Sequence, residues 1–343
     1  MRRVAEATFE SVTASEPSGP LNPRVPQGAA VAALGVGLPE RRLDNAPIAA
    51  RLAVEERWIV ARTGIHERRV AADGETVADL ATLAARRALA AADIDPADVG
   101  LVVLATMSHE RLTPNGSALV AGRIGAGSAG AIDVNAACSG FVSGLALAAG
   151  QIESGRIRTA VVIGAEVLSR LLDHYDRRTA ALFGDGAGAV VLTASSGPTR
   201  IGPVAFGSDG ARSELITAER DEGVIHMNGH DTFRQAVDRL SESTLEACGL
   251  AGVALEEINV FAYHQANARI LTAVGERLGL DPARVVNCID RLGNTSAATI
   301  PLALANADER GLLRPGARVL IAAFGGGLTW AATVVEWGGD RNG

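Results

Sequence analysis

Short apolar runs alternate along the chain with longer segments whose apolar residues recur at helical spacing. Residues 30–36 and 101–105 form apolar runs of a length typical of strands buried on both faces. Between them, residues 76–92 place apolar side chains on one helical face, and the motif Asp93-Ile94-Asp95-Pro96 ends that segment. This alternation predicts an α/β fold built on a mostly parallel sheet.

The second half of the chain repeats this order. Its pattern predicts a helix at 233–248, a strand at 258–263, a further helix that ends at Gly279, and a buried strand at 319–323. A chain of 343 residues is long enough for two domains of ordinary size or for one duplicated pair. We therefore expect a tail at residues 1–28 and two related halves at 29–198 and 199–343.

Two short matches between the halves indicate an internal duplication. Arg123-Ile124-Gly125 is answered by Arg277-Leu278-Gly279, and the 17 positions from Cys138 to Gly155 equal the 17 from Asn294 to Gly311. A chance match is the alternative. If the halves are related, Cys138 and Asn294 begin equivalent central helices and face each other across the junction of the halves.

Cys138 is the first candidate for chemistry. It lies in Ala136-Ala137-Cys138-Ser139-Gly140-Phe141, where an apolar strand at 131–134 gives way to a long helix. A helix N-terminus is expected to lower the pKa of this thiol, because partial positive charge and free N–H groups favour the thiolate. The backbone N–H of Cys138 could also form an oxyanion hole for an acyl oxygen on the same residue. A buried structural cysteine is the alternative.

Three further segments carry polar groups or glycines at the ends of apolar runs. His264 follows the strand at 258–263 directly, where sites of α/β proteins collect, although an ordinary core or surface histidine is the alternative. Asn294 precedes an apolar helix and could either cap it or donate its amide to a ligand oxygen. Phe324-Gly325-Gly326-Gly327-Leu328 ends a buried strand with glycines that admit a ligand close to the backbone, or simply make a tight turn. His109 stands at the place in the first half that corresponds to His264.

Charge, cysteine count and motif order exclude several classes of function. The net charge of −7 gives no reason to expect nucleic acid or an anionic membrane as partner. Three widely spaced cysteines favour reduced thiols and a cytoplasmic location.

The uncharged stretch 134–152 is interrupted by polar residues and glycines, so it predicts a buried helix rather than a membrane span. The loop Gly184-Asp185-Gly186-Ala187-Gly188 precedes a strand instead of a helix, which favours a structural turn over a phosphate loop. No cluster has metal-ligand spacing.

Taken together, these segments resemble the β-ketoacyl-acyl carrier protein synthase III family, the initiating condensing enzymes of the thiolase superfamily. The resemblance spans roughly residues 29–337. Six motifs carry it: Trp58-Ile59-Val60-Ala61-Arg62-Thr63-Gly64-Ile65, the Cys138 segment, Phe183-Gly184-Asp185-Gly186-Ala187-Gly188-Ala189, His264-Gln265-Ala266-Asn267, Gly293-Asn294-Thr295-Ser296-Ala297-Ala298 and Phe324-Gly325-Gly326-Gly327-Leu328-Thr329-Trp330.

The resemblance implies a fold, a reaction and a set of residues. The resemblance implies a homodimer. It also implies that each subunit folds as two similar halves in five alternating α and β layers. By position, Cys138 takes an acyl group from acyl-coenzyme A or acyl carrier protein, while His264 and Asn294 stabilise the enolate formed when a malonyl thioester loses carbon dioxide. The N–H groups of Cys138 and Gly326 resemble the oxyanion hole, and Phe324 packs nearby. No tightly bound cofactor is implied.

The same carry-over assigns two binding surfaces. Coenzyme A or pantetheine contacts are implied for Trp58, Arg62, Thr63, Arg177, Gly229, Phe233, Ala266 and Asn267. Trp58 and Arg62 suit stacking on adenine. A basic patch for the acidic carrier protein is implied for Arg234, Arg269 and Arg277, although solvated surface charge is the alternative for each.

Some positions depart from the family pattern. Thr113 stands where members with short primers often have a bulky aromatic residue that closes the acyl pocket across the dimer, so we expect a longer or wider pocket. Glu276 replaces a residue that is often basic. Such changes resemble members that serve secondary pathways, and an acyltransferase that moves an acyl group to a carrier protein, hydroxyl or amine without condensation is the alternative function. An inert partner subunit is disfavoured because it would usually lack Cys138.

Overall fold

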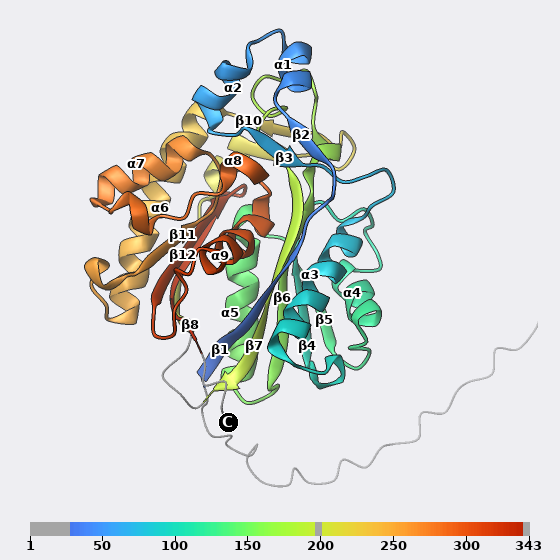
Figure 1. Ribbon diagram of the computed structural model, residues 1–343, viewed down its shortest axis with the longest axis vertical. Helices are drawn as coiled ribbons and strands as arrows, with labels where there is room; N and C mark the ends of the chain where they lie inside the picture. Colours follow the sequence, from blue (N-terminus) through green and yellow to red (C-terminus); the bar gives the residue numbers. More distant parts are fainter. Residues whose placement is uncertain (1–27, 196–200, 339–343) are drawn as a thin grey trace, which may run out of the picture.

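The computed structural model describes residues 28–195 and 201–338. Two sheets lie side by side in it, with helices between them and on both outer faces (Figure 1). The first sheet has the strand order β1 (Gly28–Gly37), β7 (Asp185–Ser195), β6 (Thr159–Val167), β4 (Leu101–Ala105), β5 (Gly130–Val134). The second has the order β11 (Val260–Tyr263), β12 (Arg318–Gly325), β13 (Thr329–Glu336), β8 (Ile201–Ser208).

Helices complete the layers. The central helices α5 (Gly140–Glu153) and α9 (Thr299–Glu309) contact both sheets and each other. Helices α3 (Val77–Ala92) and α4 (Gly116–Ile124) cover the outer face of the first sheet, while α6 (Gly229–Ala251) and α7 (Ala268–Leu278) cover that of the second (Figure 1). The α/β thiolase fold is therefore confirmed, with its layers in the order α, β, α, β, α.

Smaller elements gather at one end of the layers, at the top of Figure 1. They are α1 (Ala46–Leu52), α2 (Glu56–Thr63), α8 (Ile289–Leu292), the strand pair β2 (Arg42–Asp44) and β3 (Glu67–Arg69), and the strand pair β9 (Ile216–Ala218) and β10 (Ile225–Met227).

Local sequence accounts for the elements that frame the core. All residues of β4 and β6 are buried, as expected for strands covered by helices on both faces. Helix α3 begins at a capping box in which the Thr76 hydroxyl and the Asp79 carboxylate each accept a hydrogen bond from the other residue's backbone N–H. The uncharged stretch 134–152 contributes α5, which confirms the buried helix predicted there.

The halves are duplicated, but in a different register from the one predicted. A constant offset of 159 residues relates the ends of α3 and α6 and the starts of β4 and β11, of α5 and α9, and of β6 and β12. The short 3₁₀ turn η2 (Ala137–Ser139) corresponds to η7 (Ser296–Ala298), and both begin at a residue with positive φ, Ala137 at 44° and Ser296 at 46°. Cys138 is therefore equivalent to Ala297, three positions beyond Asn294. Pairing Cys138 with Asn294 was wrong because α9, with 11 residues, is three shorter than α5, with 14, so the glycines that follow them are out of register.

Glycines allow the turn η7 to lie against β6 in the first sheet. A Cβ atom on Gly164 would stand 2.3 Å from the carbonyl oxygen of Ala297. On β7, a Cβ atom on Gly188 would stand 2.7 Å from Cβ of Pro301 in α9. Residues 185–188 of the predicted loop at 184–188 belong to β7 itself, which agrees with a structural role rather than a phosphate loop. These close approaches bring the turn η7 of the second half next to η2, which carries Cys138, the candidate nucleophile of the first half.

Parts of the predicted domain division fall outside the described residues. This holds for residues 1–27 of the predicted tail and for the boundary at 198/199, whereas Gly28 already belongs to β1. Within residues 28–195 and 201–338, no helix is long and apolar enough to cross a membrane. In the same ranges, no group of three or more His, Cys, Asp or Glu side chains is arranged to hold a metal ion.

Candidate active site

One large cavity, of about 1770 Å³, opens between the two halves. It is lined by residues of η2, of the loop after β11, of the loop before η7 and of the hairpin between β12 and β13. The structure brings together here most of the residues singled out from the sequence: Cys138, His264, Asn294, Phe324, Gly326, Trp58, Arg62, Thr63, Arg177, Gly229, Phe233, Ala266, Asn267 and Arg269.

Cys138 lies in η2, one turn before α5, where the chain leaves β5. The glycine hairpin covers it closely, since a Cβ atom on Gly325 would stand 3.1 Å from Sγ of Cys138. Burial raises the pKa of the Cys138 thiol to about 12; the nearby Ser296 hydroxyl acts in the opposite direction, and the Glu166 charge adds to the rise. The expected lowering of this pKa is therefore wrong, because desolvation outweighs the helix end. The thiol of Cys138 is therefore uncharged near neutral pH.

His264 follows β11 and is held by its backbone, whose N–H donates to the Ala322 carbonyl at 2.8 Å. Its side chain is buried, and burial lowers its pKa to about 3, so the imidazole is neutral. Nδ1 lies 2.6 Å from Oγ1 of Thr299. The Thr299 hydroxyl also donates to the Ser296 carbonyl at 2.8 Å, an oxygen that accepts from the Thr299 backbone N–H as well.

The Thr299 hydroxyl and the ring proton of His264 are coupled. A hydroxyl has one proton, so when it donates to the Ser296 carbonyl, Nδ1 carries the ring proton and donates to Oγ1. When the hydroxyl turns to Nδ1, the ring proton lies on Nε2, and His264 presents an N–H donor to the cavity. The imidazole carries no positive charge in either tautomer.

Asn294 is fixed by its backbone and by one atom of its side chain. Its N–H donates to the Leu182 carbonyl at 2.9 Å, and its Oδ1 accepts from the Ser296 N–H at 2.8 Å. The side chain thus shapes the turn that leads into η7 rather than capping α9 directly. The amide group on Nδ2 has no partner among the described residues, so it remains available as a donor beside His264.

The backbone N–H groups proposed for an oxyanion hole are also unoccupied. Within the described part of the chain, no oxygen accepts a hydrogen bond from the backbone N–H of Cys138 or of Gly326. Both residues line the cavity, and Gly325, the last residue of β12, packs against Cys138. Two backbone donors therefore line the same cavity as the sulfur.

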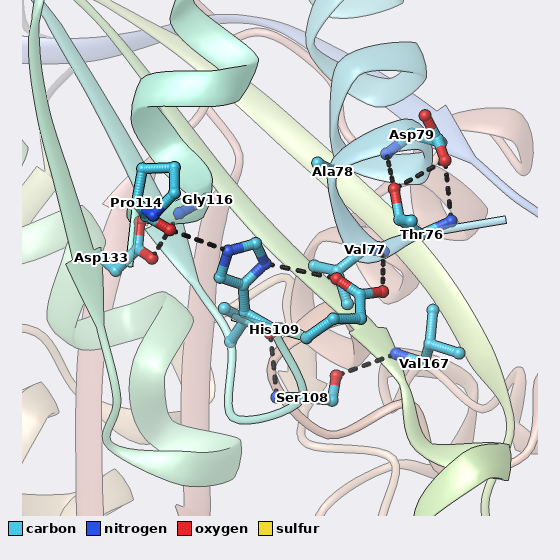
Figure 2. Close-up of polar contacts among 12 residues, drawn as sticks. Thr76, Val77, Ala78, Asp79, Ser108, His109, Pro114, Gly116, Asp133 and Val167 are labelled. Atoms are coloured by element: carbon cyan, nitrogen blue, oxygen red, sulfur yellow. Dashed lines mark hydrogen bonds and ion pairs between the residues drawn. The ribbon is translucent and has the colours of Figure 1, made fainter. Parts of the chain in front are cut away.

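His109, the histidine compared with His264 in the sequence, serves the loop after β4. It lines the cavity, but Nε2 donates to the Pro114 carbonyl at 3.2 Å, and Nδ1 faces Glu110 at 3.4 Å (Figure 2). Glu110 in turn accepts from the backbone N–H of Val77 at the start of α3. Figure 2 shows the ring between these partners. His109 therefore braces the loop and offers no second catalytic pair.

Sequence reasoning missed three buried residues beside the thiol. Glu166 is a lone carboxyl in an otherwise apolar strand, a pattern that could have signalled it. Ser296 and Thr299 stand within or just after a recognised motif, yet only the folded turn shows that their hydroxyls lie near Cys138 and His264. Thr113, in contrast, is absent from the lining of its own chain's cavity, so its predicted role across a dimer stays a prediction.

The cavity mouth holds aromatic and basic side chains in fixed positions. The Arg62 guanidinium stacks over Trp58, 4.7 Å from the ring centroid, and the Arg269 guanidinium lies 5.6 Å from the centroid of Phe233. Asn267 caps α7 and donates from Nδ2 to the Arg62 carbonyl at 2.9 Å. These contacts join α2 to α7 across the mouth.

The remaining arginines assigned by resemblance already have partners. Arg177 donates to the Leu52 carbonyl at 2.9 and 3.1 Å, so its guanidinium serves the backbone as well as the cavity. Arg277 pairs with Asp238, and Arg234 lies 3.8 Å from Asp231. Surface pairs of this kind are weak and exchangeable. Of the three docking candidates, only Arg269 lines the cavity.

Comparisons with known proteins agree with this geometry. The family model described as 3-oxoacyl-(acyl-carrier-protein) synthase III matches residues 132–210, and the model of its C-terminal part matches residues 248–337. Two relatives from Streptomyces coelicolor, named β-ketoacyl-(acyl-carrier-protein) synthase III 2 and 5, are 44% and 45% identical to this chain. They cover 91% and 90% of it and 94% and 96% of their own lengths.

Solved structures show the same similarity. The 3-oxoacyl-(acyl-carrier-protein) synthase III of Aquifex aeolicus superposes with a TM-score of 0.88 at 40% identity, covering 90% of this chain and all of that one. The priming β-ketosynthase of the R1128 polyketide pathway superposes with a TM-score of 0.87 at 35% identity, covering 92% of this chain and 98% of that one.

Proposed function

Because the chain belongs to the 3-oxoacyl-(acyl-carrier-protein) synthase III family of condensing transferases, we propose that it starts acyl chains by decarboxylative condensation. In this proposal Cys138 takes an acyl group from acyl-coenzyme A or acyl carrier protein. The acyl group is then joined to a malonyl unit carried on the phosphopantetheine arm of acyl carrier protein. Carbon dioxide and a β-ketoacyl thioester are the products.

The observation that carries the proposal is a neutral imidazole and a free amide that line the same cavity as the thiol. We assign the tautomer in which the Thr299 hydroxyl donates to Nδ1 of His264 and the ring proton lies on Nε2, while the Asn294 amide is held by its own oxygen. Two fixed donors suit the carbonyl oxygen of a malonyl thioester, where negative charge develops as the carboxylate leaves. A neutral imidazole stabilises that enolate without protonating it. Simple acyl transfer would need no such pair.

The first half-reaction uses the other side of the cavity. The sulfur of Cys138 attacks the thioester carbon of the incoming acyl group, and the leaving thiolate takes up a proton. In the tetrahedral intermediate, the N–H groups of Cys138 and Gly326 donate to the acyl oxygen. The Phe324 side chain, which is 3% exposed, shields the reacting groups from water.

The mouth supplies the features that a nucleotide thioester requires. Stacked Trp58 and Arg62 offer a flat surface and a positive charge to adenine and phosphate, and Arg269 extends the positive charge along the rim. We assign the same rim to the acidic carrier protein, with Arg269 as its main contact. Arg234 and Arg277 would exchange their present carboxylates for those of the carrier.

We also propose that the working enzyme is a homodimer. Strand β5 is an edge strand of the five-stranded sheet, and its Ile132 is 41% exposed. Near it, Leu112 on the loop after β4 is 80% exposed. An apolar sheet edge of this kind is suited to pairing with a second copy. Light scattering of the purified chain should give twice the monomer mass, and a monomer at micromolar concentration would contradict this part of the proposal.

The decisive experiment separates the two half-reactions. Asn294→Ala removes one enolate donor but leaves the thiol in place, so we expect decarboxylation of malonyl carrier protein to fall by about 10²-fold or more. Acylation of Cys138, followed by intact mass, should change little. Equal loss of both steps would refute the assigned role of Asn294.

Wild-type protein tests the alternative functions in the same assay. Acylation of Cys138 without loss of carbon dioxide, followed by transfer to an alcohol or amine, would establish an acyltransferase instead. Absence of acylation with every primer from acetyl- to long-chain and branched acyl-coenzyme A would indicate an inert partner subunit.

A further inference from the structure

The geometry leaves the fate of the Cys138 proton open. The thiol is neutral at rest, and it must lose its proton as the sulfur attacks an acyl group. His264 is poorly suited to accept that proton, because burial lowers its pKa to about 3 and the proposed condensation keeps its Nε2 protonated. The question rests on the proposed function, in which Cys138 is the nucleophile. Another acceptor must therefore lie close to the sulfur.

Glu166 is a fully buried carboxyl that the condensation steps do not use. Its Oε2 accepts from the Ser108 hydroxyl at 2.5 Å, the Thr106 hydroxyl at 3.1 Å and the Met107 N–H at 3.2 Å. Among the residues that the structure describes, its Oε1 receives the Met107 N–H alone, at 3.3 Å. One oxygen is thus saturated with donors, and the other retains acceptor capacity.

The strand geometry points Glu166 toward the turn that carries Ser296. Side chains two residues apart on a strand share a face. Gly164 of β6 lies against Ala297 of η7, so Glu166, two residues further along, faces the same turn. Gly140, two residues after Cys138, also reaches Ala297: its Cβ atom would stand 3.9 Å from that of Ala297. Turn η7 therefore separates the thiol from the carboxyl.

The Ser296 hydroxyl occupies the space between them. Ser296 is 1% exposed, and its Oγ has no hydrogen-bond partner of good geometry in this structure. Burial raises the pKa of both Cys138 and Glu166, and the Ser296 hydroxyl counteracts burial in each case, which places it near both groups. An orphan buried hydroxyl is rare and calls for a reason. A hydroxyl can accept one proton while it donates its own.

We propose that Ser296 and Glu166 form the route by which the Cys138 thiol loses its proton. As the sulfur–carbon bond forms, the S–H proton passes to Oγ of Ser296, and the Ser296 proton passes to Oε1 of Glu166. When the tetrahedral intermediate collapses, the bond between the acyl carbon and the leaving-group sulfur breaks. The proton then passes from Glu166 through Ser296 to the departing thiolate, and Glu166 is again ionised.

Glu166 is suited to this task. Burial raises its pKa to about 7, so near neutral pH it can hold or release a proton readily. The nearest titratable groups are poorly placed to replace it. Cys138 is the donor, and burial lowers the pKa of His264 to about 3. Asp185 of β7 is held on the opposite face of the sheet by Ser169 and Ala71. On the loop after β4, His109 and Glu110 face each other. His109 also contacts the Pro114 carbonyl, and Glu110 accepts from the Val77 N–H.

The test measures the reactivity of Cys138 without any assumed substrate. Iodoacetamide labels the thiol, and peptide masses separate Cys138 from the buried Cys248 and Cys288, which serve as internal references. In the wild type we expect the Cys138 rate to rise with pH and bend near pH 7, as Glu166 ionises. In Glu166→Gln we expect a rate about 10²-fold lower at pH 7.5 and no bend at pH 7. Ser296→Ala should behave like Glu166→Gln.

Asp185→Asn is the matched control. Asp185 is also a fully buried carboxyl with hydroxyl and N–H donors, but it lies on the opposite face of the sheet from Glu166. It should leave both the rate and the bend unchanged. A Glu166→Gln variant with the wild-type rate and the bend at pH 7 would overturn the proposal. If Glu166→Gln fails to fold, Ser296→Ala decides alone, and a wild-type profile in that variant would overturn the route.

A second readout separates this proposal from the proposed function. Glu166→Gln should decarboxylate malonyl-coenzyme A within a few-fold of the wild-type rate, because that step does not require the thiol to ionise. If wild-type protein fails to acylate or decarboxylate, the proposed condensation fails, yet the alkylation profile still decides the role of Glu166. Loss of decarboxylation and alkylation together in Glu166→Gln would indicate a merely structural role and refute the route.

Discussion

Thr299 offers the sharpest test of the assigned state of His264. Thr299→Val keeps the shape of the side chain and removes the hydroxyl that lies 2.6 Å from Nδ1. Without that donor, the proton can move to Nδ1, and Nε2 then faces the thioester oxygen with a lone pair. The donor that stabilises the enolate would be lost in that fraction of molecules. Thr299 is therefore a positioning residue.

The expected magnitude follows from the burial of this pair. Removing one partner leaves a buried nitrogen unsatisfied, which costs about 1–3 kcal/mol. Since about 1.4 kcal/mol corresponds to a tenfold change in rate, decarboxylation should fall by about 5- to 150-fold. The loss should appear in kcat for the malonyl substrate with little change in KM, because the donor acts on charge that develops in the transition state.

The assay compares two variants in two half-reactions. Carbon dioxide release from labelled malonyl-coenzyme A reports the enolate step, and the mass of Cys138 after exposure to acyl-coenzyme A reports acylation. Thr299→Ser retains the hydroxyl and should stay within about threefold of the wild type. Wild-type decarboxylation by Thr299→Val, or equal losses in the Val and Ser variants, would refute the assigned tautomer.

Three further predictions concern space, binding and pH. Gly325→Ala would place a Cβ atom 2.7 Å from the Cys138 nitrogen and 3.1 Å from Sγ, so acylation of Cys138 should fall by about 10²-fold. Gly275→Ala is the control, because open space surrounds that glycine, and it should leave acylation unchanged. Equal acylation rates in the two variants would contradict the close packing. Trp58→Ala should raise KM for acyl-coenzyme A about fivefold and leave kcat nearly unchanged in steady-state assays. An unchanged KM would contradict the binding role assigned to Trp58. Burial lowers the pKa of His264 from 6.5 to about 3. Between these two pH values the imidazole is protonated in the unfolded chain but not in the native one, so the free energy of unfolding falls as the pH drops from 6.5 toward 3. His264→Asn should therefore lose less stability than the wild type between pH 7 and pH 5 in urea unfolding, and parallel losses would count against a buried neutral imidazole.

Much of the fold and the outline of the site could be predicted from sequence. Apolar runs gave β4 at its observed limits and α3 within one residue, because these elements are buried by a regular pattern that packing does not override. The segments that carry Cys138, His264 and Asn294 each stand where a buried element begins or ends. In an α/β fold such places meet at one end of the sheets, and the structure places all three around one cavity.

The electrostatics of the site could not be predicted in the same way. A helix N-terminus suggested a lowered thiol pKa, but the glycine hairpin and η7 desolvate the sulfur more strongly than the helix end favours the thiolate. The duplication was also placed three residues out of register, because matching glycines after two helices assumed helices of equal length. Glu166 and Ser296 escaped notice since their proximity to Cys138 depends on the approach of η7 to β6, a contact between segments 130 residues apart in the chain.

One tracer experiment tests the central claim most directly. Purified protein would be loaded with a ¹³C-labelled acyl group on Cys138, freed of excess acyl-coenzyme A, and mixed with malonyl carrier protein. The account predicts that each acyl group lost from Cys138 is matched by one carbon dioxide and by one carrier-bound β-ketoacyl product that contains the label. Label that stays on Cys138, or that leaves it without carbon dioxide and without a new carbon–carbon bond, would contradict condensation.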